Sequence, residues 1–379
     1  MYDSKDILAL ATNNIVGSTL QDLGALMGLA NLRFGLAKVL WAQQQLGLTP
    51  DATFHTSPDF AITRNRTRWG AGFAYGGLLS WSGPFAILDL KPNACGMLVG
   101  ALQSPQNSDE LDRRLAAFGN TVVVEGVETQ WDFDSSNHFF QLYRADWKGH
   151  SDFADFDNLF LLHGSGDEHR RFLYHDRHDF VFAQRARIIS TPWGDLKILL
   201  ERHAEEFFAA YQRAQSFALA RREAFANAIL GPDIVVVTHP VHQGLAKPGA
   251  MLLGSHLPSP GALYPFAQQE RLPAYLLTTT DTDPSHSAAP LPHGSGYRIP
   301  LDFTSVEVSG EHDSERIVTL HNLESGERTT VDDIRALPFA YRGQETLQLA
   351  TSKGLASIAA ELTPLLRISQ QGTRQISQS

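Results

Sequence analysis

The sequence predicts an α+β fold in a single domain that spans residues 1–379. Three observations predict it. Helix-like stretches open the chain and recur near its middle, short apolar runs separated by glycine fill much of the rest, and no repeat or low-complexity linker divides the chain. With 43% hydrophobic and 10% aromatic residues, the chain can bury a sizeable core.

The elements follow from these patterns in order. The N-terminal part, about residues 1–50, is predicted to be helical, because "LQDLGALMGLANLRFGLAKVLWAQQQLG" spaces its apolar residues three and four apart. From Ala71 onward, "GFAYGGLLSW", "FAILDL", "GMLVGAL", "NTVVVEGVE" and "NHFFQLY" are typical of strands. The strongest helical segment is "DLKILLERHAEEFFAAYQRAQSFALARREAFANAIL", which Gly231 and Pro232 end. A β-branched run, "DIVVVTHPVHQG", follows it. We expect residues 258–300 to be largely loop and the polar tail, about 369–379, to be frayed.

Composition narrows the class of protein. A net charge of -10 and a pI of about 5.8 argue against bulk electrostatic binding of nucleic acid, although they allow a local basic groove. The single cysteine, Cys95, excludes an intrachain disulfide. We see no signal peptide and no uninterrupted apolar run near the ~18 residues of a membrane span. We therefore expect a cytoplasmic monomer that binds no membrane.

Potential metal ligands recur at the ends of strand-like runs, where a rigid sheet can present side chains to one pocket. They are Asp89, Cys95, His138, His163, His239 and His242. A thiolate, imidazoles and a carboxylate suit Mn²⁺, Fe²⁺, Co²⁺ or Zn²⁺, and the chain holds 15 histidines. The spacing matches neither a CxxC nor an HExxH pattern. Ordinary packing therefore stays open for each residue: a half-buried histidine, or a cysteine acting as a small core hydrophobe.

The order of motifs resembles the RtcB family of RNA ligases. "GFAYGGLLSWSGPFAILDLKPNACGM" is similar to the family's glycine-rich strands and Asp-x-x-Cys-Gly element, and "SSNHFFQLY" to its Gly-Asn-His-Phe motif. "LFLLHGSGDEH", "QSFALARREAF", "VVVTHPVHQG", "PLPHGSGYR" and "ALPFAYRGQETLQLATSKGLASIAAELTPLLRI" follow in the family's order. The resemblance runs from about Gly70 to Ile368.

The resemblance implies a metal centre. Cys95 would be a thiolate that bridges two metal ions, and His138 and His163 would each bind one of them. The third histidine would be His239 or His242, and Gln243 after His242 favours the second, because the family has His-Asn there. The carboxylate three residues before the cysteine is Pro92 in this chain, so Asp89 would have to replace it.

The resemblance also implies a nucleotide site. His293 would be the nucleophile that takes GMP as a phosphoramidate, an acceptable role for a neutral imidazole. The remaining nucleotide contacts implied are Asn137, Gln141, Gln243, Gly294, Ser295, Gly296 and Arg298. Arg64, Arg66 and Arg68 either contact phosphates or lie on a solvated loop.

Several departures from the family pattern concern this nucleotide site. Gln141 replaces a Glu, Tyr297 stands where the family has Arg, and Ser369 stands where it has a guanine-contacting Lys. The family's Pro-Asp-x-His element finds no match near Arg68. These departures leave ATP as an alternative to GTP.

The function that the resemblance implies is a GTP- and Mn²⁺-dependent RNA ligase of tRNA splicing or RNA repair. It would join an RNA 3′-phosphate or 2′,3′-cyclic phosphate to a 5′-hydroxyl through a histidine–GMP intermediate. The alternatives are a metal-dependent phosphoesterase and a non-catalytic protein that binds RNA ends.

Overall fold

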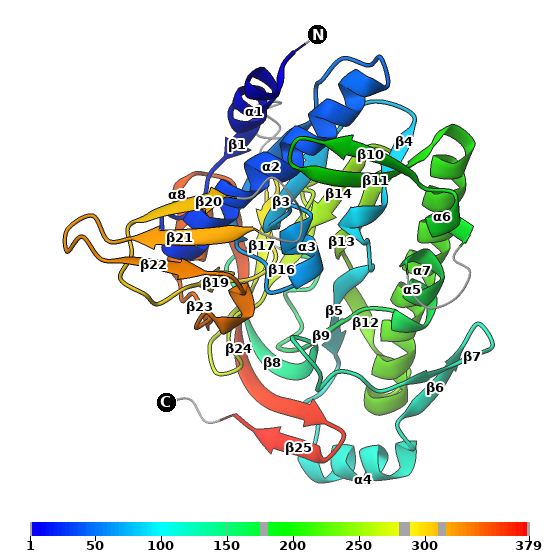
Figure 1. Ribbon diagram of the computed structural model, residues 1–379. Coiled ribbons are helices and arrows are strands. Elements are labelled where there is room, and N and C mark those ends of the chain that lie inside the picture. The colour runs from blue at the N-terminus through cyan, green and yellow to red at the C-terminus, as the bar shows by residue number, and fades with distance from the viewer. Residues whose placement is uncertain (1, 150, 175–180, 280–288, 310–315, 377–379) are drawn as a thin grey trace.

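The computed structural model describes residues 2–149, 151–174, 181–279, 289–309 and 316–376. A curled sheet of thirteen strands runs through these residues (Figure 1). Only β1 and β2 pair in parallel among its described strands, so the sheet is mixed. Along the sheet the strands are β1 (Ile15–Gly17), β2 (Thr53–Ala61), β3 (Tyr75–Ser80), β14 (Ala250–Leu253), β13 (Val241–Lys247), β5 (Cys95–Leu102), β9 (Asn158–Gly164), β8 (Phe139–Trp147), β24 (Ser357–Ser369), β17 (Ala274–Thr278) and β16 (Leu263–Phe266). Off this path, β12 (Val235–Thr238) pairs with β5, and β25 (Gly372–Gln375) pairs with β24.

Smaller sheets flank the large one. They are β10 (Arg187–Thr191), β11 (Gly194–Leu200) and β4 (Phe85–Ile87); β20 (Ser305–Ser309), β21 (Ile317–His321) and β22 (Arg328–Val331); β6 (Thr121–Val124) and β7 (Val127–Gln130); β15 (Ser255–His256) and β18 (Leu291–Pro292); and β19 (Tyr297–Arg298) and β23 (Ala340–Tyr341). Two 3₁₀ turns are present: η1 (Leu88–Leu90) lies between β4 and β5, and η2 (Ile334–Ala336) lies between β22 and β23.

Two long helices supply most of the helical packing. The helices are α1 (Ser4–Asn13), α2 (Leu23–Gln45), α3 (Arg66–Gly70), α4 (Ser108–Phe118), α5 (Asp167–Tyr174), α6 (Val181–Gln184), α7 (Glu201–Leu230) and α8 (Glu345–Ser352). Helix α2 packs on β2, β11 and β20, whereas α7 packs against β5, β9 and β13 (Figure 1). Helix α7 therefore supports the three strands that carry the cysteine and histidines of the candidate site.

Helix α2 is apolar enough, by length and composition, to cross a membrane. This differs from the expectation that no apolar stretch approaches the length of a membrane span. Helix α2 reaches that length because it consists mostly of small and apolar residues and contains only two charged ones. In the structure 78% of its apolar window is buried inside the protein. A helix that is apolar on all sides is typical of a core helix as well as of a span.

The α+β class predicted from the sequence is confirmed, but three segments differ from expectation. Residues 195–200 belong to strand β11, where buried Leu196 and Ile198 alternate with exposed Asp195 and Lys197, so α7 begins only at Glu201. The region predicted as loop contains β16 and β17, which pair with each other. Residues 372–375 of the predicted frayed tail instead form β25, which pairs with β24, and residues 377–379 of that tail lie outside the described residues.

Candidate metal centre

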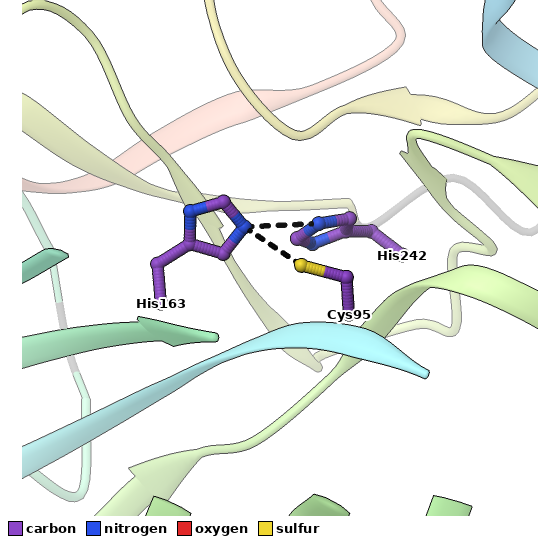
Figure 2. A group of neighbouring side chains, drawn as sticks. All are labelled: Cys95, His163 and His242. Atoms are coloured by element: carbon purple, nitrogen blue, oxygen red, sulfur yellow. Dashed lines mark hydrogen bonds between the residues drawn. The ribbon is translucent and has the colours of Figure 1, made fainter. Parts of the chain in front are cut away.

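Three neighbouring strands bring Cys95, His163 and His242 together. Cys95 begins β5, and the antiparallel neighbour β9 ends just beyond His163, which pairs with Met97. On the other side of β5, Val241 pairs with Gly96 and Gln243 with Cys95, so the register shifts at His242. Such a bulge re-aims a side chain. Figure 2 shows the three side chains pointing toward one another.

The cluster has the dimensions of a metal site. The Cys95 Sγ lies 3.1 Å from His163 Nε2, which in turn lies 3.3 Å from His242 Nε2. All three donor atoms lie within 4.8 Å of one another, and all three residues are buried. His138 Nε2 lies slightly farther out, 3.8 Å from the same sulfur. A buried Cys–His–His group is therefore present that could hold a metal ion.

Hydrogen bonds fix the orientation of two of the imidazoles. His163 Nδ1 donates to the carbonyl oxygen of Asn137 at 2.8 Å, and His138 Nδ1 donates to Asp132 Oδ2 at 3.2 Å. A proton held on Nδ1 leaves Nε2, which faces the sulfur, as the nitrogen that can bind a metal, and this is the arrangement of a metal-binding histidine. Nδ1 of His242 finds no partner among the described residues.

The surroundings favour a deprotonated thiol and a neutral His242. Burial alone would raise the pKa of Cys95, but the neighbouring His163 and hydrogen bonds from the three histidines hold it well below its usual value. Burial, and then the nearby His293, lower the pKa of His242 well below 6.5. Burial would also lower the pKa of His138, yet Asp132 and Cys95 raise it to about 10. Without a metal His138 therefore holds a proton on both ring nitrogens, and a bound metal ion would displace the one on Nε2. A thiolate beside neutral imidazoles is the donor form that metals require.

His293 lies against this cluster. Its ring centroid is 4.5 Å from that of His242, and it follows the short strand β18. The buried carboxylate of Asp59, in β2, accepts hydrogen bonds at Oδ2 from His293 N at 3.0 Å, His293 Nδ1 at 2.7 Å and Gly294 N at 3.4 Å. Burial would lower the pKa of His293, but the Asp59 carboxylate raises it. Asp59 therefore fixes both the backbone and the ring of His293.

A cavity of about 1020 Å³ joins the cluster to most of the predicted nucleotide residues. Gly294, Ser295 and Gly296 line it with Asn137, and Gly296 has a φ of 72°, in the region that favours glycine. Buried Gln243 and Ser295 also line it, and their side-chain polar atoms find no partner within the described part of the chain. The predicted nucleotide residues in its wall are Asn137, Gln141, Gln243, Gly294, Ser295 and Gly296. Unpaired buried polar atoms of this kind favour a polar ligand.

Asp89 is not brought to the cluster. It lies in η1, outside the cavity wall, and its Oδ2 accepts a hydrogen bond from the backbone N of Lys197 at 2.9 Å. After η1 the chain turns through left-handed conformations at Lys91, φ 49°, and Ala94, φ 54°, before it reaches Cys95. The prediction that Asp89 supplies a metal-binding carboxylate is therefore wrong.

Two other predicted residues, His239 and Arg298, also lie outside the cavity wall. His239 accepts a hydrogen bond from Arg222 Nε at 2.7 Å and does not line the cavity, which decides between the two histidines in favour of His242. Arg298 is exposed and outside the cavity wall, and Tyr297 occupies the wall instead. This corrects the prediction that Arg298 contacts the nucleotide.

The three arginines of "TRNRTRW" have three different settings. Arg64 lines the cavity, with its guanidinium 6.0 Å from the Tyr297 ring. Arg66 is exposed and lies outside the cavity wall. Arg68 is buried and donates to the carbonyl oxygen of Leu90 at 3.4 Å. Of these three arginines, only Arg64 is placed to contact a ligand in the cavity.

Two carboxylates of the site were not predicted from the sequence. Asp59 was overlooked, although the dipeptide Pro58–Asp59 in the strand-like stretch "TFHTSPDFA" was a usable signal. Asp132 shows no signal beyond its place in "WDFD", six residues before His138. Both accept hydrogen bonds from histidines of the centre.

No protein-family model and no curated protein matches this sequence.

Proposed function

We propose that the chain is a divergent RtcB-like enzyme that transfers a nucleotide to an RNA end by way of His293. The observation that carries the proposal is one cavity holding both a Cys–His–His cluster and a histidine held by a carboxylate, His293 with Asp59. The proposed reaction joins a 3′-phosphate or 2′,3′-cyclic phosphate to a 5′-hydroxyl, with GTP as the nucleotide.

The residues present suit a divalent ion. Cys95, His163 and His242 would hold it, with His138 beside them. When bound there, such an ion would neutralise charge on a triphosphate. The expected metal is Mn²⁺, but a sulfur and nitrogen donor set generally binds Co²⁺ and Zn²⁺ more tightly, so all three belong in the test.

His293 would act as the nucleophile. Its Nδ1 proton is held by Asp59, so in the neutral form of the ring Nε2 is the nitrogen that attacks. A bond forms between Nε2 and the α-phosphorus of GTP as the bond to pyrophosphate breaks. A 2′,3′-cyclic phosphate would first be opened by water, which breaks the bond from phosphorus to O2′ and leaves a 3′-phosphate. The nucleotide then passes to the RNA 3′-phosphate, and the 5′-hydroxyl displaces GMP. Arg64 and the unpaired amide of Gln243 would contact the bound substrate.

Covalent labelling tests the proposal. Protein incubated with α-labelled GTP and Mn²⁺, Co²⁺ or Zn²⁺ should gain an acid-labile label of GMP mass. His293→Ala should abolish the label, and Cys95→Ala should abolish it together with metal content. His203→Ala, which alters a surface histidine of α7, should keep it. ATP is tested in parallel, because Gln141 and Tyr297 alter the family's nucleotide contacts.

A metal-dependent phosphoesterase is the second candidate. The position of Pro92 and the distant Asp89 favour it, because they leave no carboxylate from this segment for a second ion. Release of phosphate from an oligonucleotide with a 3′-phosphate or cyclic phosphate end, without any labelling by GTP or ATP, would support this second function and refute the first.

A further inference from the structure

Asp132 links a buried arginine to a histidine of the metal centre. It lies on the segment between β7 and β8, and its carboxylate uses one oxygen for each partner. Oδ1 accepts a hydrogen bond from Arg221 Nη2 at 3.0 Å, and Oδ2 accepts one from His138 Nδ1 at 3.2 Å. Its side chain is 24% exposed, and it lines the cavity.

Arg221 is anchored independently of the centre. Its side chain is 1% exposed on α7, and it also donates to the carbonyl oxygens of Gln130 at 2.6 Å and Ser165 at 3.2 Å. Glu168 accepts a further hydrogen bond from Arg221 Nε at 3.3 Å. A planar guanidinium with this many fixed acceptors cannot rotate freely. The orientation of the Asp132 carboxylate is therefore set by α7.

The consequence is a fixed tautomer of His138. Because Oδ1 accepts the hydrogen bond from Arg221, Oδ2 accepts the one from His138 Nδ1. The other ring nitrogen, Nε2, then faces the sulfur of Cys95 at 3.8 Å. We propose that Asp132 is a positioning residue that makes His138 an additional metal ligand beside Cys95, His163 and His242. The carboxylate of this centre would then hydrogen-bond to a metal-binding histidine rather than coordinate the ion itself. The inference rests on the metal binding proposed above.

The chemistry of an asparagine at position 132 gives a sharp test. In Asp132→Asn, the amide oxygen accepts the hydrogen bond from Arg221, because a guanidinium can only donate. The amide NH₂ therefore faces His138 Nδ1. That contact moves the histidine proton to Nε2 and blocks the ligand lone pair. Asp132→Ala only removes the orienting group. A positioning role therefore predicts that Asn is at least as damaging as Ala, whereas a space-filling role predicts that Asn is milder.

The assay is Co²⁺ affinity, measured by chelator competition and by the visible absorption of the bound ion. Both Asp132 variants should bind Co²⁺ about 10- to 100-fold more weakly than the wild type. Asp134→Asn is the matched control on the same loop, because Asp134 accepts from Trp131 Nε1 and Gln370 N and does not touch the His138 ring. Its carboxylate lies 4.0 Å from Arg367, a separation that an asparagine tolerates, so the variant should bind normally. Adding Asp132→Ala to His138→Ala should cause little further loss, since Asp132 acts only through His138.

Each other outcome overturns the inference. Normal Co²⁺ affinity in the Asp132 variants, even with lowered stability of the metal-free protein, would leave Asp132 with a structural role only. The inference would also be refuted if the losses of Co²⁺ affinity from Asp132→Ala and His138→Ala added in the double variant. It would likewise be refuted if Asp132→Asn lost less Co²⁺ affinity than Asp132→Ala. Failure of the wild type to bind Co²⁺ would instead remove the proposed metal centre itself.

Discussion

Replacing Asp59 by alanine should be among the most destabilising single changes in the site. The Asp59 side chain is 0% exposed, and its carboxylate accepts hydrogen bonds from two N–H groups of His293, from Gly294 N and from the Ser57 hydroxyl. Each buried donor left without an acceptor costs about 1–3 kcal/mol, so three N–H donors would cost about 3–9 kcal/mol. Water from the cavity can satisfy part of this. We therefore expect a loss near the lower end, about 3–5 kcal/mol.

Asp59→Asn should be much milder. The asparagine oxygen can occupy the position of Oδ2 and keep the three N–H donors, while its NH₂ faces Ser57. A serine hydroxyl can accept as well as donate, so that contact survives. The variant loses only the charge-assisted part of these bonds, about 1–2 kcal/mol.

Urea denaturation of both variants measures these losses. Asp146→Ala is the control, because the Asp146 side chain is 66% exposed and pairs with Lys148 at the surface. Its unfolding midpoint should stay near that of the wild type. A loss below about 1 kcal/mol for Asp59→Ala, or equal losses for Ala and Asn, would show that this carboxylate does not hold the His293 loop.

Two further predictions concern pH and packing. Burial, and then the charge of Arg222, lower the pKa of His239 in the folded protein to about 2, so this residue stays neutral there while it binds a proton in the unfolded chain below pH about 6.5. Its contribution to stability is complete above that pH and falls as pH decreases. Between pH 7 and 5.5, urea denaturation should therefore show the wild type losing about 1 kcal/mol more than His239→Gln, and equal losses would refute the assignment. In α2, Gly35→Ala would place a Cβ 2.2 Å from the carbonyl oxygen of Gly72. The strain of about 1–3 kcal/mol should exceed the gain of about 1 kcal/mol in helix propensity, so thermal unfolding should occur at a lower temperature than in Gly149→Ala, whose Cβ meets nothing within 4 Å. A stabilised Gly35→Ala variant would contradict the close packing of α2 on Gly72.

Local patterns were enough to predict the α+β fold class and to mark Cys95, His163 and His242 as candidate metal ligands. A long apolar stretch with residues spaced three and four apart identifies α2, and short apolar runs identify β5 and β9, because elements buried on all sides are apolar along their whole length. Cys95 and His163 could be placed at strand ends for the same reason. Residues 195–200 were misassigned because a short alternating strand runs directly into the charged helix α7, with only the alternation to separate them.

The residues that orient the site could not be found by such patterns. Asp59 and His293 are 234 positions apart, and Asp132 and Arg221 are 89 apart, so no window of sequence contains either pair. His242 was favoured over His239 by the glutamine that follows it. The physical difference is that a bulge in β13 re-aims His242, whereas His239 accepts a hydrogen bond from Arg222. Asp89 shows the converse error, since a carboxylate six positions from the cysteine is turned away by two left-handed residues. In this chain spacing identifies candidate ligands, and buried carboxylates and arginines from distant segments decide which of them converge.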